Sequence, residues 1–244
     1  MEHWAAERGG GVLTEENRHS GIFFDARAAT SLQGDPYTNG AWLKHAQKEL
    51  DEGYEFLDFI REKYPKRVTF FGSGRESMAH SVYKSAERLG GMLAREGCAV
   101  ISGGNGGIMS AVAKGAYEAG GTTIGFGANV ANESPSPYLT HSFRFDNLFV
   151  RQELLIRSGN AYVFYPGGFG TQYEFFHLLA LMQLARVEKV PLIVIGFDYW
   201  NELKQWIRKQ LVDTNRTIDL EDGELFTVVA DEEEAYRVLH AWFS

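Results

Sequence analysis

The chain has 244 residues, of which 44% are hydrophobic and 23% are charged, as is ordinary for a globular protein with a sizeable core. Its net charge of -8 argues against a general binder of nucleic acids or of acidic membranes. The single cysteine, Cys98, excludes an intrachain disulfide and a cysteine-ligated zinc site. Because the apolar runs are also too short to span a membrane, we expect a soluble, cytoplasmic protein.

The N-terminal quarter of the chain differs from the rest. Residues 1–40 show no sustained hydrophobic period, which predicts an irregular or partly ordered arm. The pattern from about Ala41 to Tyr64 is helical, and Pro65 ends it. We therefore divide the chain into an N-terminal arm and helix, residues 1–65, and a main domain, residues 66–244.

The main domain alternates apolar runs typical of strands with segments of helical period. The strands are expected near residues 68–71, 98–101, 122–126, 142–145, 161–165, 191–196 and 226–229. Strands that alternate with helices at these lengths predict right-handed βαβ units. The expected fold class is α/β, with a doubly wound, mostly parallel sheet flanked by helices and preceded by a helical extension.

Three glycine-rich turns directly follow predicted strands, at residues 72–74, 102–107 and 167–170. In a parallel sheet the carboxyl ends of the strands lie along one edge, where ligands bind. Each turn taken alone is most simply a tight turn that requires glycine. The recurrence of three such turns on one edge favours a binding site.

Two common kinds of site fit these turns poorly. A dinucleotide-binding turn needs a third glycine where Ser77 stands, and an acidic residue at the end of the second strand, where Ile101 and Ser102 stand. A nicotinamide cofactor is therefore not expected. Glu174 and His177 form an E-x-x-H pair, but the second pair that a carboxylate-bridged di-metal site requires is absent from the sequence, so no metal is expected.

The third turn lies in the stretch Pro166–Glu174, between a predicted strand and a predicted helix. Its backbone N–H groups and the positive end of the helix dipole are suited to hold a phosphate, with Glu174 at the rim. Thr171 and Glu174 also fit a capping box, in which Glu174 would reach back to the Thr171 amide. Both interpretations stay open. By spacing alone Arg151 is more simply a surface residue than an anion-binding one, and Gln152 beside it is interpreted as a solvated residue.

The stretch Pro166–Glu174 matches P-G-G-x-G-T-x-x-E and resembles the signature of the LOG family, nucleoside 5′-monophosphate phosphoribohydrolases long mislabelled as lysine decarboxylases. The second turn, residues 102–109, resembles the family's G-G-G-x-G-[IL]-M turn. Arg151 falls where the family places a catalytic arginine. Two positions depart from the family pattern: Gln152 replaces the usual lysine, and Asn105 replaces the third glycine of the second turn.

The resemblance implies a Rossmann-like fold, a homodimer or higher oligomer, and no metal or redox cofactor. It implies cleavage of a purine or cytokinin-type nucleotide to free base and ribose 5-phosphate. Arg151 and Glu174 would be catalytic. The remaining implied substrate-binding residues are Gly72, Ser73, Gly103, Gly104, Asn105, Glu133, Gln152, Gly167, Gly168, Phe169, Gly170 and Thr171.

Two other functions compete with this one. A nucleotide-binding or molybdenum-cofactor carrier of the same fold would need no catalytic pair, and the departure at Gln152 keeps this alternative open. A pyridoxal-dependent decarboxylase would need a lysine in or beside the glycine-rich turns. The sequence has none there, and Lys114 falls in the middle of a predicted helix.

Overall fold

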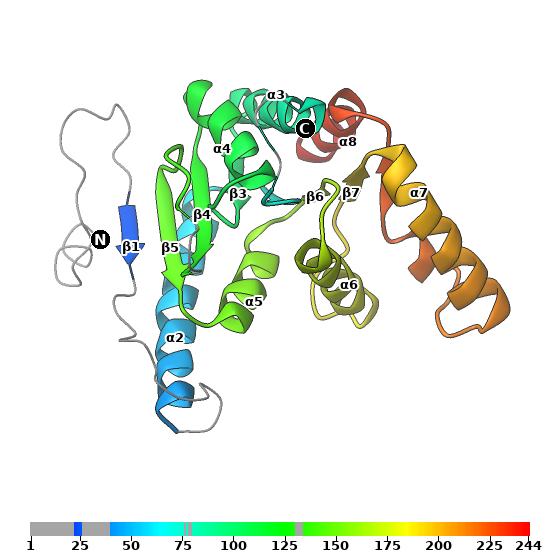
Figure 1. The fold of residues 1–244 in the computed structure, drawn as a ribbon, viewed down its shortest axis with the longest axis horizontal. Coiled ribbons are helices and arrows are strands. Elements are labelled where there is room, and N and C mark those ends of the chain that lie inside the picture. Colours follow the sequence, from blue (N-terminus) through cyan, green and yellow to red (C-terminus); the bar gives the residue numbers. More distant parts are fainter. Residues whose placement is uncertain (1–21, 26–39, 76, 78–79, 130–133) are drawn as a thin grey trace.

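The structure is a computed structural model that describes residues 22–25, 40–75, 77, 80–129 and 134–244 (Figure 1). The strands are β1 (Ile22–Asp25), β2 (Arg67–Phe71), β3 (Ala99–Ser102), β4 (Thr123–Ala128), β5 (His141–Phe145), β6 (Tyr162–Phe164), β7 (Leu192–Ile195) and β8 (Thr227–Val229). The helices are α2 (Gly40–Lys63), α3 (Ser81–Arg95), α4 (Ile108–Glu118), α5 (Leu148–Ser158), α6 (Phe169–Gln183), α7 (Phe197–Trp206) and α8 (Glu232–Phe243). A π-helical segment, Ile207–Thr214, continues α7, and a 3-10 turn, Asp222–Glu224, precedes β8.

The strands form one eight-stranded sheet in the order β1-β5-β4-β3-β2-β6-β7-β8, and every neighbouring pair is parallel. From β2 the chain adds β3, β4 and β5 in turn on one side. It then returns to the other side of β2 and adds β6, β7 and β8 there. The predicted doubly wound, parallel α/β fold is confirmed. Its winding direction reverses between β2 and β6, and open sheets of this class bind ligands at such a reversal.

Helices cover both faces of the sheet (Figure 1). On one face, α2, α5, α6 and α7 pack against side chains such as Phe126, Phe145 and Phe164. On the other face, α3, α4 and α8 pack against side chains such as Val68, Val100 and Val163. Alternate strand residues therefore point into two separate cores, which explains why most strands are apolar runs without polar alternation.

The expectation of an irregular arm over residues 1–40 is wrong for the four residues Ile22–Asp25, which form β1, and for Gly40, which begins α2. The rest of that range lies outside the described residues. Strand β1 pairs in parallel with β5, with Ile22 opposite His141, and forms one edge of the sheet. Four residues are too short a run to show a hydrophobic period, so their pairing depends on β5 and could not be seen locally. The next segment matches its prediction closely, since α2 spans Gly40–Lys63.

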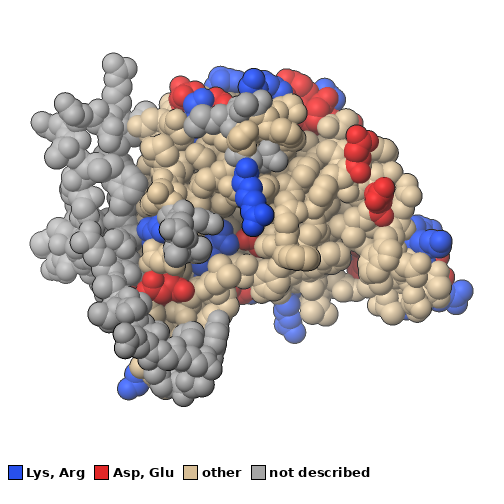
Figure 2. All heavy atoms as spheres, viewed as in Figure 1, with Lys and Arg blue, Asp and Glu red and all other residues tan. Residues whose placement is uncertain are grey.

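Charged side chains are unevenly distributed over one face of the molecule. On the face drawn in Figure 2, uncharged atoms cover most of the middle, which is interrupted by one Lys or Arg side chain near the centre, and most other charged side chains lie toward the margins. Among the described residues, none of the helices combines the length and the apolar composition that crossing a bilayer requires.

Candidate active site

The three glycine-rich turns meet at the carboxyl edge of the sheet, where β3, β2 and β6 are neighbours. The Ser73 amide, in the first turn, donates to the Pro166 carbonyl at 3.0 Å, at the start of the third turn. The Ser73 carbonyl accepts from the Ile108 amide at 3.0 Å, at the end of the second turn. Backbone hydrogen bonds therefore join all three turns, and the winding reversal between β2 and β6 lies beneath them.

Glycine is required where the first and second turns touch. Gly107 has a φ of +64°, and a Cβ there would lie 2.2 Å from the Ser73 carbonyl oxygen. A Cβ at Gly72 would lie 2.9 Å from the Ile108 side chain. A side chain at either position would push the two turns apart, so Gly72 and Gly107 allow the turns to approach each other closely.

The third turn leads directly into α6, with Gly168 as the residue that precedes the helix. First-turn amides of a helix have no intrahelical acceptor, so those of Phe169, Gly170 and Thr171 can donate to an anion. A Cβ added at Gly168 or at Gly170 would meet no atom within 4 Å, which means that the space in front of these residues is open. The geometry is that of an anion cradle.

The capping-box interpretation of Thr171 and Glu174 is wrong. Helix α6 begins at Phe169, so Thr171 already lies inside the first turn. Its hydroxyl lies under Gly167, where a Cβ would come within 2.2 Å of Thr171 Oγ1. The Glu174 carboxylate, one turn further, bonds to a side chain from a different helix.

That side chain is Arg151 of α5. Arg151 Nη1 donates to Glu174 Oε1 at 2.8 Å, and Arg151 Nε donates to the carbonyl of Phe126, in β4, at 3.0 Å. Arg151 is 9% exposed and Glu174 is 7% exposed. The interpretation of Arg151 as a surface residue is therefore wrong. The fold holds a buried ion pair beside the anion cradle.

Burial and pairing act on the Glu174 carboxyl in opposite directions. Burial raises its pKa because the carboxylate loses water, while the Arg151 guanidinium opposes that rise. The pKa remains above its ordinary value. Shifted carboxyl groups of this kind are common in catalytic sites, although structural ion pairs also produce them.

The second turn completes the surroundings of Arg151. A Cβ at Gly103 would lie 2.1 Å from Arg151 Nη2 and 2.5 Å from Met109 Sδ. The guanidinium thus occupies space that only a glycine at this position leaves free. Gly103, Arg151 and Glu174 come from three different loops or helices, and the fold brings them together.

The other predicted substrate-binding residues have varied surroundings. Asn105 is 4% exposed, and Gly104 lies against β4, where its Cβ would come within 3.0 Å of Gly125 Cα. Gln152 is 8% exposed, so its interpretation as a solvated residue is wrong. Phe169 is 97% exposed at the mouth of the cradle. Glu133 lies outside the described residues.

Two contributors to this region carried no signal in the sequence. Tyr199 of α7 donates its hydroxyl to the Gly167 carbonyl and accepts from Gln172 Nε2 at 3.0 Å, which fixes the outer side of the third turn. Glu49 of α2 is 1% exposed and binds the start of α5. Both contacts join segments distant in the chain, so no local spacing could indicate them.

Cys98 is buried as expected, and burial raises the pKa of its thiol to about 11. A thiol with such a pKa is almost fully protonated at neutral pH, so it is a poor nucleophile.

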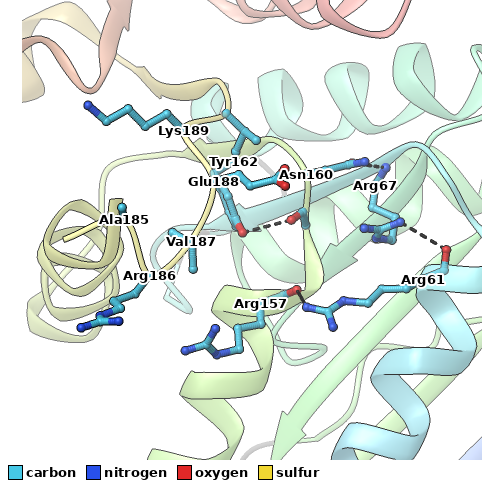
Figure 3. A pocket seen from close by; sticks show the side chains of 12 residues that line it. Arg61, Arg67, Arg157, Asn160, Tyr162, Ala185, Arg186, Val187, Glu188 and Lys189 are labelled. Carbon is cyan, nitrogen blue, oxygen red and sulfur yellow. Dashed lines mark hydrogen bonds between the residues drawn. The ribbon is translucent and has the colours of Figure 1, made fainter. Parts of the chain in front are cut away.

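A basic cleft of about 680 Å³ lies at the opposite, amino edge of the sheet, where β2 and β6 begin (Figure 3). Two of its arginines are bound to carbonyls at the ends of helices. Arg61 Nη2 donates to the Arg157 carbonyl at 2.9 Å, and Arg67 Nε donates to the Ser158 carbonyl at 2.8 Å. Both contacts stabilise the C-terminus of α5, and Arg67 Nη1 also donates to the Tyr64 carbonyl at 2.7 Å, just after α2. The positive charge of these two arginines is therefore accounted for without a ligand.

The sequence is similar to that of known enzymes. The family described as "Possible lysine decarboxylase" matches residues 109–239. A cytokinin riboside 5′-monophosphate phosphoribohydrolase of Rhodococcoides fascians is 28% identical over 153 residues, which are 61% of this chain and 77% of the relative. The corresponding LOG5 enzyme of Arabidopsis thaliana is 24% identical over 163 residues, 64% of this chain and 70% of the relative.

The fold is similar to that of solved molybdenum-cofactor proteins. The molybdenum cofactor binding protein of Rippkaea orientalis superposes with a TM-score of 0.57 at 18% identity, covering 73% of this chain and 98% of that one. The molybdenum cofactor carrier protein of Chlamydomonas reinhardtii gives a TM-score of 0.57 at 24% identity with the same coverage. At these identities the likeness concerns the fold alone. The match over more than half of the sequence shows that the chain belongs to the LOG family, whose members were described as possible lysine decarboxylases.

Proposed function

We propose that this protein hydrolyses the N-glycosidic bond of a nucleoside 5′-monophosphate, of purine or cytokinin type, to the free base and ribose 5-phosphate. The observation that carries the proposal is the buried contact of Arg151 with Glu174 next to the open anion cradle of α6. The relatives named as phosphoribohydrolases support the same reaction class.

The 5′-phosphate would bind at the third turn. Amides of Gly167, Gly168, Gly170 and Thr171 would donate to its oxygens, and the positive end of the α6 dipole favours its charge. This group takes no part in bond breaking. Its binding energy instead fixes the position of the ribose relative to the ion pair.

The reacting carbon, C1′, would then face Glu174. As the bond between C1′ and the base nitrogen breaks, its electron pair leaves with the base, and positive charge develops on the ribose ring. The Glu174 carboxylate would stabilise that charge and orient a water molecule, whose oxygen bonds to C1′ while its proton is released for transfer to the base. Arg151 would donate to the departing base or hold the substrate in place.

A lysine decarboxylase acting through an imine finds no support in the surroundings of Lys114. Lys114 Nζ donates to Glu87 Oε1 at 2.7 Å, between α4 and α3. This hydrogen bond raises the pKa of the lysine, whereas an imine-forming lysine needs a lowered pKa.

A molybdenum-cofactor or nucleotide carrier is the second function that the fold could support, because the neighbours named above share it. A carrier needs to bind its ligand, but it does not need a carboxylate to stabilise charge that develops on a reacting ribose. The buried ion pair therefore favours the enzyme.

A second copy of this chain is the proposed partner, bound along α6. The exposed large side chains of this helix are Phe169, Tyr173 and Phe176, and Leu184 directly follows it. They recur at spacings of three, four and eight residues, which places them along one face of the helix. The helix has no Lys or Arg, and its one carboxylate is the buried Glu174. An uncharged helix face is suited to pair with its own copy about a twofold axis.

The reaction is tested by incubating the purified protein with a panel of nucleoside 5′-monophosphates and measuring free base and ribose 5-phosphate. Matched nucleosides without the phosphate should not react, because they cannot occupy the cradle. Glu174→Gln and Arg151→Ala should each remove activity while the protein remains folded. Tight binding of an intact nucleotide with no base released from any member of the panel would favour the carrier instead.

A further inference from the structure

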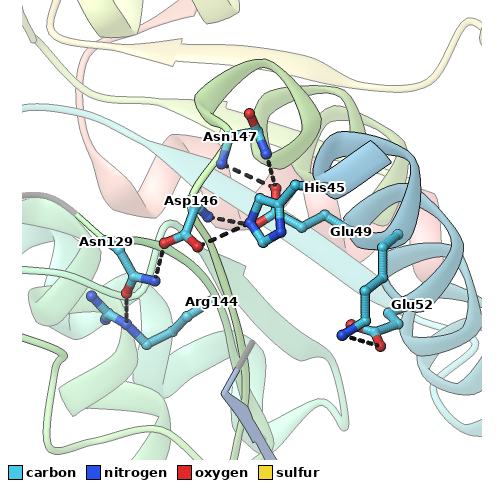
Figure 4. Close-up of polar contacts among 8 residues, drawn as sticks. His45, Glu49, Glu52, Asn129, Arg144, Asp146 and Asn147 are labelled. Atoms are coloured by element: carbon cyan, nitrogen blue, oxygen red, sulfur yellow. Dashed lines mark hydrogen bonds and ion pairs between the residues drawn. The ribbon is translucent and has the colours of Figure 1, made fainter. Parts of the chain in front are cut away.

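Helix α2 contacts the beginning of α5 through one buried carboxylate (Figure 4). Glu49 Oε1 accepts from the Asp146 amide at 2.6 Å, and Glu49 Oε2 accepts from the Asn147 amide at 3.0 Å and from Asn147 Nδ2 at 2.7 Å. Asn147 is the residue that precedes α5 and makes no capping bond of its own. Glu49 of α2 therefore caps the N-terminus of another helix, α5, although Asn147 lies 98 residues further along the chain.

The two helices remain in contact beyond this cap. A Cβ at Gly53, one turn after Glu49, would lie 2.3 Å from Leu154 Cδ1, so α2 and α5 approach as closely as a glycine allows. Near the end of both helices, Arg61 Nη2 donates to the Arg157 carbonyl at 2.9 Å. Helix α2 thus holds α5 at its start, its middle and its end.

Arg151 lies in the part of α5 that Glu49 holds. The Arg151 amide donates to the Asn147 carbonyl at 3.1 Å, so the residue that Glu49 binds is also the acceptor of the first-turn bond of Arg151. A carboxylate at a helix N-terminus stabilises that end through the dipole and through hydrogen bonds to its free amides. If this turn frayed, the guanidinium would lose its fixed position relative to Glu174.

We infer that Glu49 is a positioning residue, through which helix α2 of the N-terminal extension keeps Arg151 in place against Glu174. The inference rests on the proposed function for its kinetic consequence. It gives a role to residues 40–63, which precede the main domain and contribute no group to the glycine-rich turns.

The side chains around Glu49 are accounted for by hydrogen bonding. His45 Nε2 lies 3.0 Å from Asp146 Oδ2 and 3.5 Å from Glu49 Oε1, an arrangement that resembles a cation site. Both oxygens of Glu49, however, already accept from N–H groups. Asp146 Oδ1 likewise accepts from Asn129 Nδ2 at 2.7 Å. The oxygens that a cation would need as ligands therefore already accept hydrogen bonds from N–H groups.

The first test follows hydrogen exchange of backbone amides in the full-length protein. Glu49→Gln places an NH₂ group against N–H donors and removes the charge at the start of α5. Exchange in residues 146–151 should become faster, while exchange in α6 stays unchanged. Asp51→Asn removes a carboxylate from an exposed position of the same helix and should leave both segments as in the parent protein.

The second test separates positioning from general destabilisation. With a nucleotide that the parent protein cleaves, Glu49→Gln should lower kcat on the order of 10- to 100-fold, because a displaced catalytic group costs rate in this range. KM should change less than about threefold, since the phosphate cradle belongs to α6. The Arg151 Nε–H proton, which donates to the Phe126 carbonyl, should shift or broaden in the NMR spectrum.

Asn147→Ala provides a milder variant if Glu49→Gln does not fold, because it removes only one of the three bonds to Glu49. It should show the same changes at smaller size. Exchange and kcat equal to those of Asp51→Asn would overturn the inference. A parent protein that releases no base from any nucleotide would instead refute the proposed function, and the exchange and NMR measurements would still decide whether Glu49 holds Arg151.

Discussion

Gly103 and Arg151 share one space: the guanidinium Nη2 lies 2.1 Å from the point where a Cβ of residue 103 would be. The second glycine-rich turn therefore leaves the room that the ion pair needs. Two residues 48 positions apart in the sequence must match in size for Arg151 to reach Glu174.

Gly103→Ala should displace Arg151 and lower the rate of nucleotide cleavage on the order of 100-fold, with a loss of about 1–3 kcal/mol in the free energy of unfolding. Gly106→Ala is the matched control in the same turn, because its Cβ would meet only the Gly74 carbonyl at an ordinary 3.5 Å. Steady-state kinetics and urea unfolding of both variants check this. Equal activity of the two variants would contradict the shared space.

The Glu174 carboxyl should titrate above the usual range of a glutamate, since burial outweighs the opposing effect of Arg151 on its pKa. Arg151→Met should raise that pKa further, because the neighbouring cation that favours the carboxylate is gone. The measurement is ¹³C NMR of labelled glutamate carboxyls, with Glu174→Gln to assign the signal. If the Glu174 carboxyl titrates at the same pH as the exposed glutamates, burial does not determine its pKa.

His141 should make the protein less stable in mild acid. Burial, assisted by Lys63, lowers the pKa of this imidazole to about 4 from its usual 6.5, whereas the unfolded chain binds the proton near 6.5. Because the unfolded state binds more protons in this window, the free energy of unfolding should fall by about 3 kcal/mol from pH 6.5 to pH 4. Denaturant unfolding at several pH values gives the dependence of the unfolding free energy on pH, and this dependence should be weaker for His141→Gln. An unchanged dependence of the unfolding free energy on pH in His141→Gln would contradict this origin.

Phe176→Glu should convert the proposed dimer to a monomer, because a charge would be buried in the centre of an uncharged interface. Analytical ultracentrifugation measures the change. Leu220→Glu introduces the same charge at an exposed apolar residue in another segment and should leave the dimer intact. A parent protein that sediments as a monomer at high concentration would refute this interface.

The parallel sheet and the three glycine-rich turns at its carboxyl edge were predictable because each rests on local pattern: apolar runs, glycine clusters and helical periods. The resemblance to a family directed attention to Arg151 and Glu174, which spacing alone could not connect. What local pattern could not give was burial imposed by distant segments. Gln152 resembles a solvated residue in sequence, and the T-x-x-E pattern indicates a cap, until α5 and α6 are placed together.

The same limit applies to Glu49. In a helix of mixed polarity it resembles the many surface carboxylates around it, and only the start of α5, near residue 147, gives it three donors. Strand β1 is a similar case, since its four residues become a strand by pairing with β5. Contacts of this kind depend on topology, so they become visible only once the fold is known.

Helix α2 also supplies Phe56, whose ring lies 5.5 Å from that of Phe126 and 5.8 Å from that of Phe143. A protein shortened to begin at residue 66 would leave these aromatic rings of the sheet facing water. Helix α2 and the aromatic residues of the sheet that it covers must consequently be kept or replaced together. A chimera that grafts residues 40–63 onto a shorter relative should succeed only if the aromatic residues of β4 and β5 are transferred with them.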